Sequence, residues 1–148
     1  MVSVVHIAED FATTGGGVTT AIAELSGQLA RIGLKQKIIF AGEESIPAPE
    51  GVQIQGLRLV SLAKKWRYPR GIKAVLSHTL TDDSVVHLHG IWMAPQYLAV
   101  ALSRKKGIPV VLSAHNMLGE WFWKDGLARQ IKKTIYWQCL SGPRFKKV

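Results

Sequence analysis

The chain has 148 residues, of which 47% are hydrophobic and 20% charged, and this composition excludes an intrinsically disordered chain. Its length fits one domain, and a domain of this size buries roughly 68–70% of the surface that its unfolded chain exposes. The formal net charge of +9 favours anionic partners, such as phosphorylated small molecules, acidic membrane surfaces or nucleic acid.

The first half of the chain predicts a strand, a glycine-rich loop, a helix and two further strands. Residues 2–8 are apolar and β-branched, which is typical of a buried strand, and residues 10–17 form a loop that ends in three glycines. Apolar residues three and four apart then predict one buried helix face, and Gly33 ends this helix: Val18, Ile22, Leu25, Leu29 and Ile32. Residues 36–41 and 52–57 predict strands, separated by a loop over 43–51.

The second half continues the alternation. Residues 71–79 predict a helix and 84–88 a strand, while the basic and aromatic segment 63–70 fits neither pattern. A helix starts near Pro95 and ends at Gly107, after three cations that favour the negative end of the helix dipole. Pro109 to Ala114 predicts the last clear strand. A loop or short helix (115–124) and a basic amphipathic helix (126–140) follow.

This alternation predicts the α/β class: a Rossmann-like, three-layer α/β/α domain with a mostly parallel sheet covered on both faces and right-handed crossovers. Ligands of such sheets bind at the carboxyl ends of the strands. Three loops follow strand ends, at residues 15–17, 89–92 and 115–123. We therefore expect these three loops to lie on one rim of the sheet.

The glycine loop, Gly15-Gly16-Gly17, suits a phosphate or a hydroxyl-rich ligand. Glycine lets backbone amides approach a ligand closely, and the helix that follows presents free N–H groups and a positive dipole end. The spacing is not a dinucleotide fingerprint, because Thr20 occupies the position of the third glycine, and no Walker lysine follows. The alternative is a tight strand-to-helix turn without a ligand.

Three histidines lie in or directly after predicted strands. His87 and His89 are two residues apart and point to the same face, and together with His115 they could form a three-histidine zinc site. No carboxylate or cysteine pair occurs at a matching spacing, so we expect no metal, a buried His87 and a His89 at the rim. His115 and Asn116 directly follow a strand, where they are placed to meet a polar ligand.

Two aromatic segments allow more than one interpretation. Trp121, Phe122 and Trp123 indicate either partial core packing with one exposed ring or contact with an apolar acceptor or a membrane. The membrane interpretation is supported by cations on the helix that follows: Arg129, Lys132 and Lys133. Residues 64–68 could stack on nucleic acid, but we expect them to form a solvated loop.

Three segments together resemble the N-terminal domain of family 4 glycosyltransferases, which are retaining enzymes of the GT-B type. They are Gly15-Gly16-Gly17-Val18, Val85-Val86-His87-Leu88-His89-Gly90-Ile91-Trp92 and Ile108-Pro109-Val110-Val111-Leu112-Ser113-Ala114-His115-Asn116-Met117-Leu118. They occur in the family's order and at its spacing. The resemblance implies that residues 1–140 are one half of a GT-B architecture, incomplete at its C-terminal end, followed by a short basic tail at 141–148.

The resemblance implies transfer of a hexose from a nucleotide-sugar to a glycan or lipid-linked acceptor with retention, and no cofactor. By resemblance, Gly16 and Gly17 line the cleft near the donor phosphates and the acceptor, and His89 and Trp92 lie on the acceptor side. His115 contacts the transferred sugar, which it positions and stabilises. Asn116 is a further substrate-binding candidate and stands where the family often has glycine.

The family's second domain binds the nucleotide-sugar and carries a pair of glutamates, and the printed sequence stops at Val148 without them. We therefore expect a truncated or split glycosyltransferase that does not transfer sugar alone and has a separate C-terminal-domain chain as a partner. Cys139 is the only cysteine, and neither a signal peptide nor a membrane-spanning run is apparent. We expect a cytoplasmic protein of polysaccharide biosynthesis in peripheral contact with anionic lipid at the inner face of the plasma membrane, without a nucleic-acid partner.

Two other functions fit parts of the sequence. One is a Rossmann domain that binds an NAD-type cofactor in an oxidoreductase, with Glu43 near the end of the second strand as the ribose-binding acid. The imperfect glycine pattern argues against it. The other is a non-catalytic module whose basic surface binds nucleic acid or anionic lipid.

Overall fold

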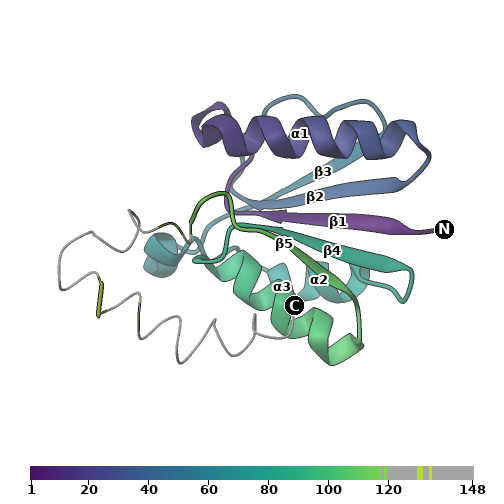
Figure 1. The fold of residues 1–148 in the computed structure, drawn as a ribbon. Coiled ribbons are helices and arrows are strands. Elements are labelled where there is room, and N and C mark those ends of the chain that lie inside the picture. Colours follow the sequence, from purple (N-terminus) through teal and green to yellow (C-terminus); the bar gives the residue numbers. More distant parts are fainter. Residues whose placement is uncertain (118, 120–129, 132–133, 135–148) are drawn as a thin grey trace.

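A computed structural model describes residues 1–117, 119, 130–131 and 134 of the chain. Within these residues, five strands form one parallel sheet in the order β3-β2-β1-β4-β5 (Figure 1). The strands are β1 (Ser3–Ala8), β2 (Lys35–Ala41), β3 (Val52–Leu57), β4 (Ser84–His89) and β5 (Val110–Ser113). The predicted helix at 126–140 and the aromatic run at 121–123 lie outside the described residues, apart from three positions of that helix.

Helices cover both faces of the sheet, as the alternation predicts. Helix α1 (Gly16–Arg31) lies on one face, and α2 (Ile72–Thr79) and α3 (Ala94–Lys106) lie on the other (Figure 1). Two 3-10 turns, η1 (Thr13–Gly15) and η2 (Ser61–Trp66), follow β1 and β3. The Rossmann-like three-layer fold is thereby confirmed. Within the part of the chain described, no helix is both long and apolar enough to cross a membrane.

Side chains from the two faces of the sheet pack into two separate hydrophobic cores, because successive side chains of a strand point to opposite faces. The core under α2 and α3 is the larger and is built from buried aliphatic side chains: Val5, Ile7, Ile39, Val86, Leu88, Ile72, Leu76 and Val100, among others. The core under α1 contains Ala8, Phe11, Ile22, Ile38, Phe40 and Val52. Continuous apolar strands are therefore explained by burial on both sides.

Helix α1 does not bury the face that its apolar spacing predicts. The buried residues are Thr19, Ile22 and Ser26, whereas Leu25 is 37% and Ile32 73% exposed. Small side chains let this helix approach the sheet closely. The two hydroxyls are hydrogen-bonded to backbone carbonyl groups, 3.1 Å in each case, so their burial leaves no polar group unpaired. The prediction of an apolar stripe that includes Leu25 and Ile32 is wrong.

The basic and aromatic segment after β3 is folded onto the molecule, so the expectation of a solvated loop is wrong. Backbone hydrogen bonds between residues 58–60 and 68–70 close it into a narrow loop. The ring of Trp66 lies 6.3 Å from that of Tyr68 and 5.7 Å from that of Tyr97 on α3. The pair with Tyr97 holds the loop against α3.

Arg67 connects this loop to the carboxyl ends of β1 and β2. Its Nε donates to the carbonyl oxygen of Glu9 at 2.6 Å, and its Nη2 donates to that of Ala41 at 2.5 Å. The same Nη2 lies 3.5 Å from a carboxylate oxygen of Asp10. The Arg67 guanidinium therefore donates hydrogen bonds to two backbone carbonyl oxygens that lie where strands of the sheet end.

We predict that Arg67→Met lowers the free energy of unfolding by about 1.5–3 kcal/mol, because hydrogen bonds from a charged donor are lost at two strand ends. Urea unfolding followed by far-UV circular dichroism measures this change. Arg70→Met is the matched control, since Arg70 belongs to the same loop and is exposed. Equal destabilisation by the two substitutions would contradict a special role for Arg67.

Candidate functional site

The carboxyl ends of β1 and β4 are neighbours, and they mark the point where the strand order reverses. Ligands of doubly wound sheets bind in the crevice at this point. A small cavity of about 50 Å³ opens there, with Gly15, His89 and Met117 in its lining. Each of these residues comes from a different one of the three loops that follow strand ends. The sequence-based prediction that these loops share one rim is therefore confirmed for the described residues.

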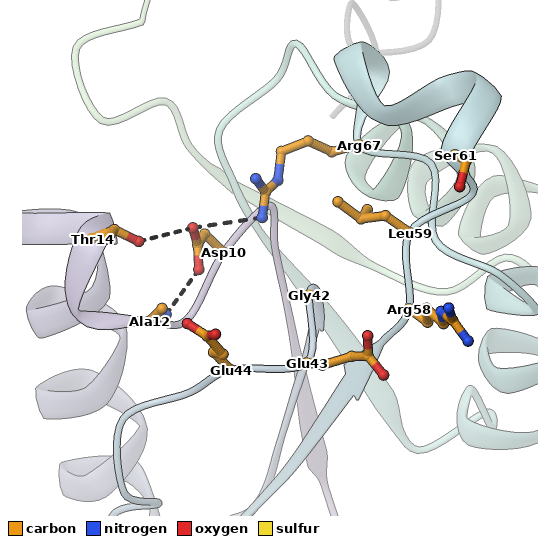
Figure 2. A pocket seen from close by; sticks show the side chains of 10 residues that line it. All are labelled: Asp10, Ala12, Thr14, Gly42, Glu43, Glu44, Arg58, Leu59, Ser61 and Arg67. Carbon is orange, nitrogen blue, oxygen red and sulfur yellow. Dashed lines mark hydrogen bonds and ion pairs between the residues drawn. The ribbon is translucent and has the colours of Figure 1, made fainter.

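Asp10 organises the glycine loop. One of its carboxylate oxygens accepts a hydrogen bond from the backbone N–H of Ala12 at 2.8 Å, and the other accepts one from the Thr14 hydroxyl at 3.4 Å. The ion pair with Arg67 holds the carboxylate from the opposite side (Figure 2). The path of the chain from β1 into α1 is thus set by a side chain that sequence analysis did not single out.

Two of the three glycines of the loop are required by the fold, for different reasons. A Cβ atom at Gly15 would overlap the hydroxyl of Thr19, and Gly16 has a φ of 56°, where other residues are strained. At Gly17 neither reason holds, because φ is not positive and a Cβ atom would meet nothing within 4 Å. The structure places Gly16 and Gly17 at the exposed start of α1.

A chain of side-chain hydrogen bonds runs from Gln36, near the amino end of β2, to the rim. The Oε1 atom of Gln36 lies 2.9 Å from Nε2 of His6, and Nδ1 of His6 lies 3.0 Å from Nε2 of His89. Nδ1 of His89 then lies 2.9 Å from Nε2 of His115. His89 is only 2% exposed, and both of its ring nitrogens are engaged. It lines the small cavity and is hydrogen-bonded to His115, which is not part of that lining.

His87 lies beside this chain, as the two-residue spacing from His89 predicts. Their ring centroids are 4.2 Å apart, and Nε2 of His87 is hydrogen-bonded to the Ser113 hydroxyl at 2.8 Å. One nitrogen each of His6, His87 and His89 lies within 4.8 Å of the others, which is a geometry that a metal ion could use. This trio differs from the predicted one, since His6 replaces His115. A metal ion would have to displace the existing hydrogen bonds, and the expectation of no metal stays a prediction.

Burial keeps the histidine cluster neutral. It lowers the pKa of His87 to about 4 and that of His89 to about 2, and neighbouring imidazoles add to both effects. Burial also lowers the pKa of His6, although the hydrogen bond to Gln36 opposes the shift. The pKa of the half-buried His115 is lowered by burial as well. At neutral pH each ring therefore carries one N–H and one lone pair.

The turn after β5 gives His115 its position. The backbone N–H of Met117 donates to the carbonyl oxygen of Ala114 at 2.9 Å, and the two residues between them have φ values of 46° (His115) and 64° (Asn116). Two successive positive φ values are typical of a type I′ turn, where Asn and Gly are preferred. Asn116 therefore adopts this conformation at little conformational cost. Its side chain is exposed.

Trp92 and Gly90 attach this turn to the loop after β4. The Trp92 indole donates to the carbonyl oxygen of Met117 at 3.3 Å. Gly90 has a φ of 88°, and a Cβ atom there would lie 3.0 Å from the Met117 sulfur. The structure thus brings His89, Trp92, His115 and Asn116 together at one end of the rim.

A larger cavity of about 420 Å³ lies at the other end of the rim, beyond Asp10 (Figure 2). It is lined by side chains from the loops after β1, β2 and β3, which include three carboxylates and two guanidinium groups: Asp10, Glu43, Glu44, Arg58 and Arg67. Sequence analysis considered Glu43 only as a ribose-binding acid and missed Asp10, Arg58 and Arg67. Burial raises the pKa of the adjacent Glu9, and this effect is opposed by Arg67.

We predict that the free energy of unfolding decreases as the pH falls below about 6.5, the pKa of a histidine in the unfolded chain. The unfolded chain then binds protons that the folded chain excludes from His6, His87 and His89, so stability is complete above this pH. Each of the three contributes a slope of up to about 1.4 kcal/mol per pH unit until its folded pKa is reached. Urea unfolding at several pH values between 7.5 and 5 measures the slope.

The exposed His78 supplies the control for this prediction. His78→Gln should leave the slope unchanged, whereas His87→Leu should reduce it by up to about one third, because one of three buried groups is removed while His115, whose pKa is also lowered, still contributes. A stability that does not change between pH 7.5 and 5 would contradict this prediction, because the rings would then bind protons in the folded chain as readily as in the unfolded chain.

We predict that Asn116→Ala destabilises the chain by about 1 kcal/mol, because alanine is disfavoured at a positive φ. Asn116→Gly keeps the turn without this cost and serves as the matched variant. Thermal unfolding followed by circular dichroism compares the two. Equal stability of the alanine and glycine variants would contradict the left-handed conformation at this position.

A family model described as a glycosyl transferase 4-like domain matches residues 16–141, which is most of the chain. The match includes the glycines at the start of α1 and the loops after β4 and β5. Comparison with curated proteins and with solved structures gives no match. The parallel α/β sheet and the family match agree, and the chain belongs to the family of glycosyl transferase 4-like domains.

Proposed function

We propose that the chain forms the acceptor-side part of a site that transfers a hexose from a nucleotide-sugar to a glycan or lipid-linked acceptor, with retention and without a cofactor. One observation carries the proposal. Within the matched region, the first turn of α1 contains a glycine, Gly17, whose missing side chain the fold itself does not require. A ligand that approaches the backbone closely explains a glycine at that position.

The start of α1 is suited to an anionic or hydroxyl-rich ligand. No side chain caps its first turn, and this turn contains no acidic residue. Free N–H groups and the positive end of the helix dipole therefore face the space in front of Gly17. We assign this position to the phosphate groups of the nucleotide-sugar or to the acceptor hydroxyl groups that lie beside them.

His115 is proposed to contact the transferred sugar. Its ring is half-buried, held by His89 and carried by a turn that Trp92 anchors. A ring held in this way loses little conformational freedom when a ligand binds, which favours positioning and stabilisation of the reacting sugar. His89, Trp92 and Asn116 contribute on the acceptor side, His89 through the ring of His115.

The larger cavity, at the other end of the rim, is proposed to receive the part of the acceptor that lies farther from His115. Carboxylates accept hydrogen bonds from sugar hydroxyl groups, and the guanidinium groups of Arg58 and Arg67 donate to ring or bridging oxygens. Its volume of about 420 Å³ falls within the range of small-molecule sites. The lining is mostly polar, with Leu59 and Ala12 as its apolar side chains, which suits the glycan portion of an acceptor better than a lipid tail. Peripheral membrane contact and a separate partner chain remain proposals beside this one.

The experiment compares two glycine substitutions on one helix. Gly17→Ala places a methyl group in the space assigned to the ligand, whereas Gly27→Ala places one 3.4 Å from Pro49, which is ordinary contact, ten residues further along α1. Each substitution raises helix propensity by roughly 0.5–1 kcal/mol. We expect both variants to fold at least as stably as the original chain.

Binding of a panel of nucleotide-sugars and acceptor sugars is measured by isothermal titration calorimetry, with sugar transfer measured in parallel. Gly17→Ala should weaken sugar binding about tenfold, equivalent to about 1.4 kcal/mol, and Gly27→Ala should leave it unchanged. Equal affinities of the two variants would contradict the proposal. Saturable binding of NAD in place of nucleotide-sugars would favour the oxidoreductase alternative instead.

A further inference from the structure

The hydrogen-bond chain beneath the rim contains two residues that the proposed function does not use. His6 is fully buried and Gln36 is 3% exposed, so neither can contact a ligand. Both nevertheless connect to His115, the ring at the rim, through His89. Burial of polar side chains costs free energy unless each one is hydrogen-bonded, and along this chain every ring nitrogen from Gln36 to Nε2 of His115 has a partner.

Gln36 determines which atom donates and which accepts in each hydrogen bond of this chain. Its side-chain amide nitrogen donates to the carbonyl oxygen of Leu34 at 3.3 Å, which turns the amide oxygen towards His6. A carbonyl oxygen only accepts hydrogen bonds, so Nε2 of His6 must carry the proton. The tautomer of the first ring is therefore set by an amide that is itself fixed by the backbone.

The direction propagates from ring to ring. A neutral imidazole has one N–H and one lone pair, so His6 accepts at Nδ1 and Nε2 of His89 must donate to it. Nδ1 of His89 then accepts, and Nε2 of His115 must donate. Each ring is thus held in the same tautomer. Nδ1 of His115 keeps its lone pair, and within the described residues no hydrogen bond reaches this atom.

We propose that Gln36, His6 and His89 are positioning residues that hold His115 in the Nε2–H tautomer, so that its Nδ1 accepts a hydrogen bond from a hydroxyl group of the bound sugar. The ligand half of this inference rests on the proposed function. A lone pair at Nδ1 attracts a hydroxyl proton and repels the anionic oxygens of a phosphate. His115 is thereby assigned to a sugar hydroxyl, and the diphosphate is left to the start of α1.

The tautomer is read directly from the full chain without ligand. Uniformly ¹⁵N-labelled protein at pH 7.5 gives long-range ¹H–¹⁵N spectra in which the protonated and unprotonated nitrogens of each imidazole are resolved. We expect His6, His89 and His115 to be protonated at Nε2 and unprotonated at Nδ1. A proton on Nδ1 of His115, or an averaged mixture of both tautomers, would overturn the inference even before any substitution is made.

Two glutamine substitutions test the role of Gln36. Gln36→Leu removes the acceptor that sets the direction, and the spectrum of His115 should lose its single tautomer and become a mixture. Gln96→Leu is the matched control, since Gln96 is a fully buried glutamine that donates to the backbone carbonyl oxygen of His89 without touching a ring nitrogen. It should leave the tautomer unchanged. Should Gln36→Leu not fold, Gln36→Met offers a side chain of closer shape with a weak acceptor.

An unchanged His115 tautomer in a folded Gln36→Leu or Gln36→Met variant would remove Gln36 from the mechanism. The spectrum of the free chain does not depend on sugar transfer, so this result is separate from the proposed function. Failure of the proposed function appears instead as equal sugar affinities of Gly17→Ala and Gly27→Ala, with the tautomer intact. The two inferences therefore fail in distinguishable ways.

Discussion

The register between β1 and β4 is the constraint on which the rim depends. His6 pairs with His87 across these two parallel strands, and His89 lies two residues further on. A shift of β4 by one residue would turn the rings of His87 and His89 away from His6 to the opposite face of the sheet, into the aliphatic core under α2 and α3. There the ring nitrogens would lose their partners, at roughly 1–3 kcal/mol for each unpaired polar group. The histidine hydrogen bonds therefore help to select the register, and the register places His115.

Backbone strain in the described part of the chain is concentrated at the same rim. The non-glycine residues with positive φ there are Arg67, His115 and Asn116. Arg67 is held by the carbonyl groups of Glu9 and Ala41, and the turn at His115 by β5 and the Trp92 indole. Unfavourable backbone conformations persist where surrounding contacts fix them, and such positions concentrate at functional sites. At the rim, these residues thus adopt backbone conformations that their residue types disfavour, because surrounding contacts fix them there.

The sequence predicts the strands and the shared rim well, because buried parallel strands are continuous apolar segments and their carboxyl ends meet at one edge. It also predicts that His87 and His89 share a face, since strand alternation is local.

The sequence does not identify Arg67, whose acceptors are backbone carbonyl groups 58 and 26 residues away in the chain. His6 and Gln36 were missed for a related reason. Each is a single polar residue within a strand, and its partner becomes visible only when strand order and register are known. The buried face of α1 was misassigned because Thr19 and Ser26 satisfy their own hydroxyl groups locally.

Stability alone does not account for the polar interior beneath the rim. Replacing both partners of a buried hydrogen bond with apolar groups of the same shape is often nearly neutral or stabilising. The aliphatic residues that fill the opposite face of the same strands show that such packing is accessible to this sheet. Buried imidazoles also make the fold sensitive to acid, because the unfolded chain binds protons that the folded chain excludes. The hydrogen-bond chain from Gln36 through His6 and His89 differs from such packing because it reaches the rim. There it leaves Nδ1 of His115 unprotonated, as a hydrogen-bond acceptor. An apolar core of equal stability would support the sheet equally well, but it would not determine whether that nitrogen carries a proton.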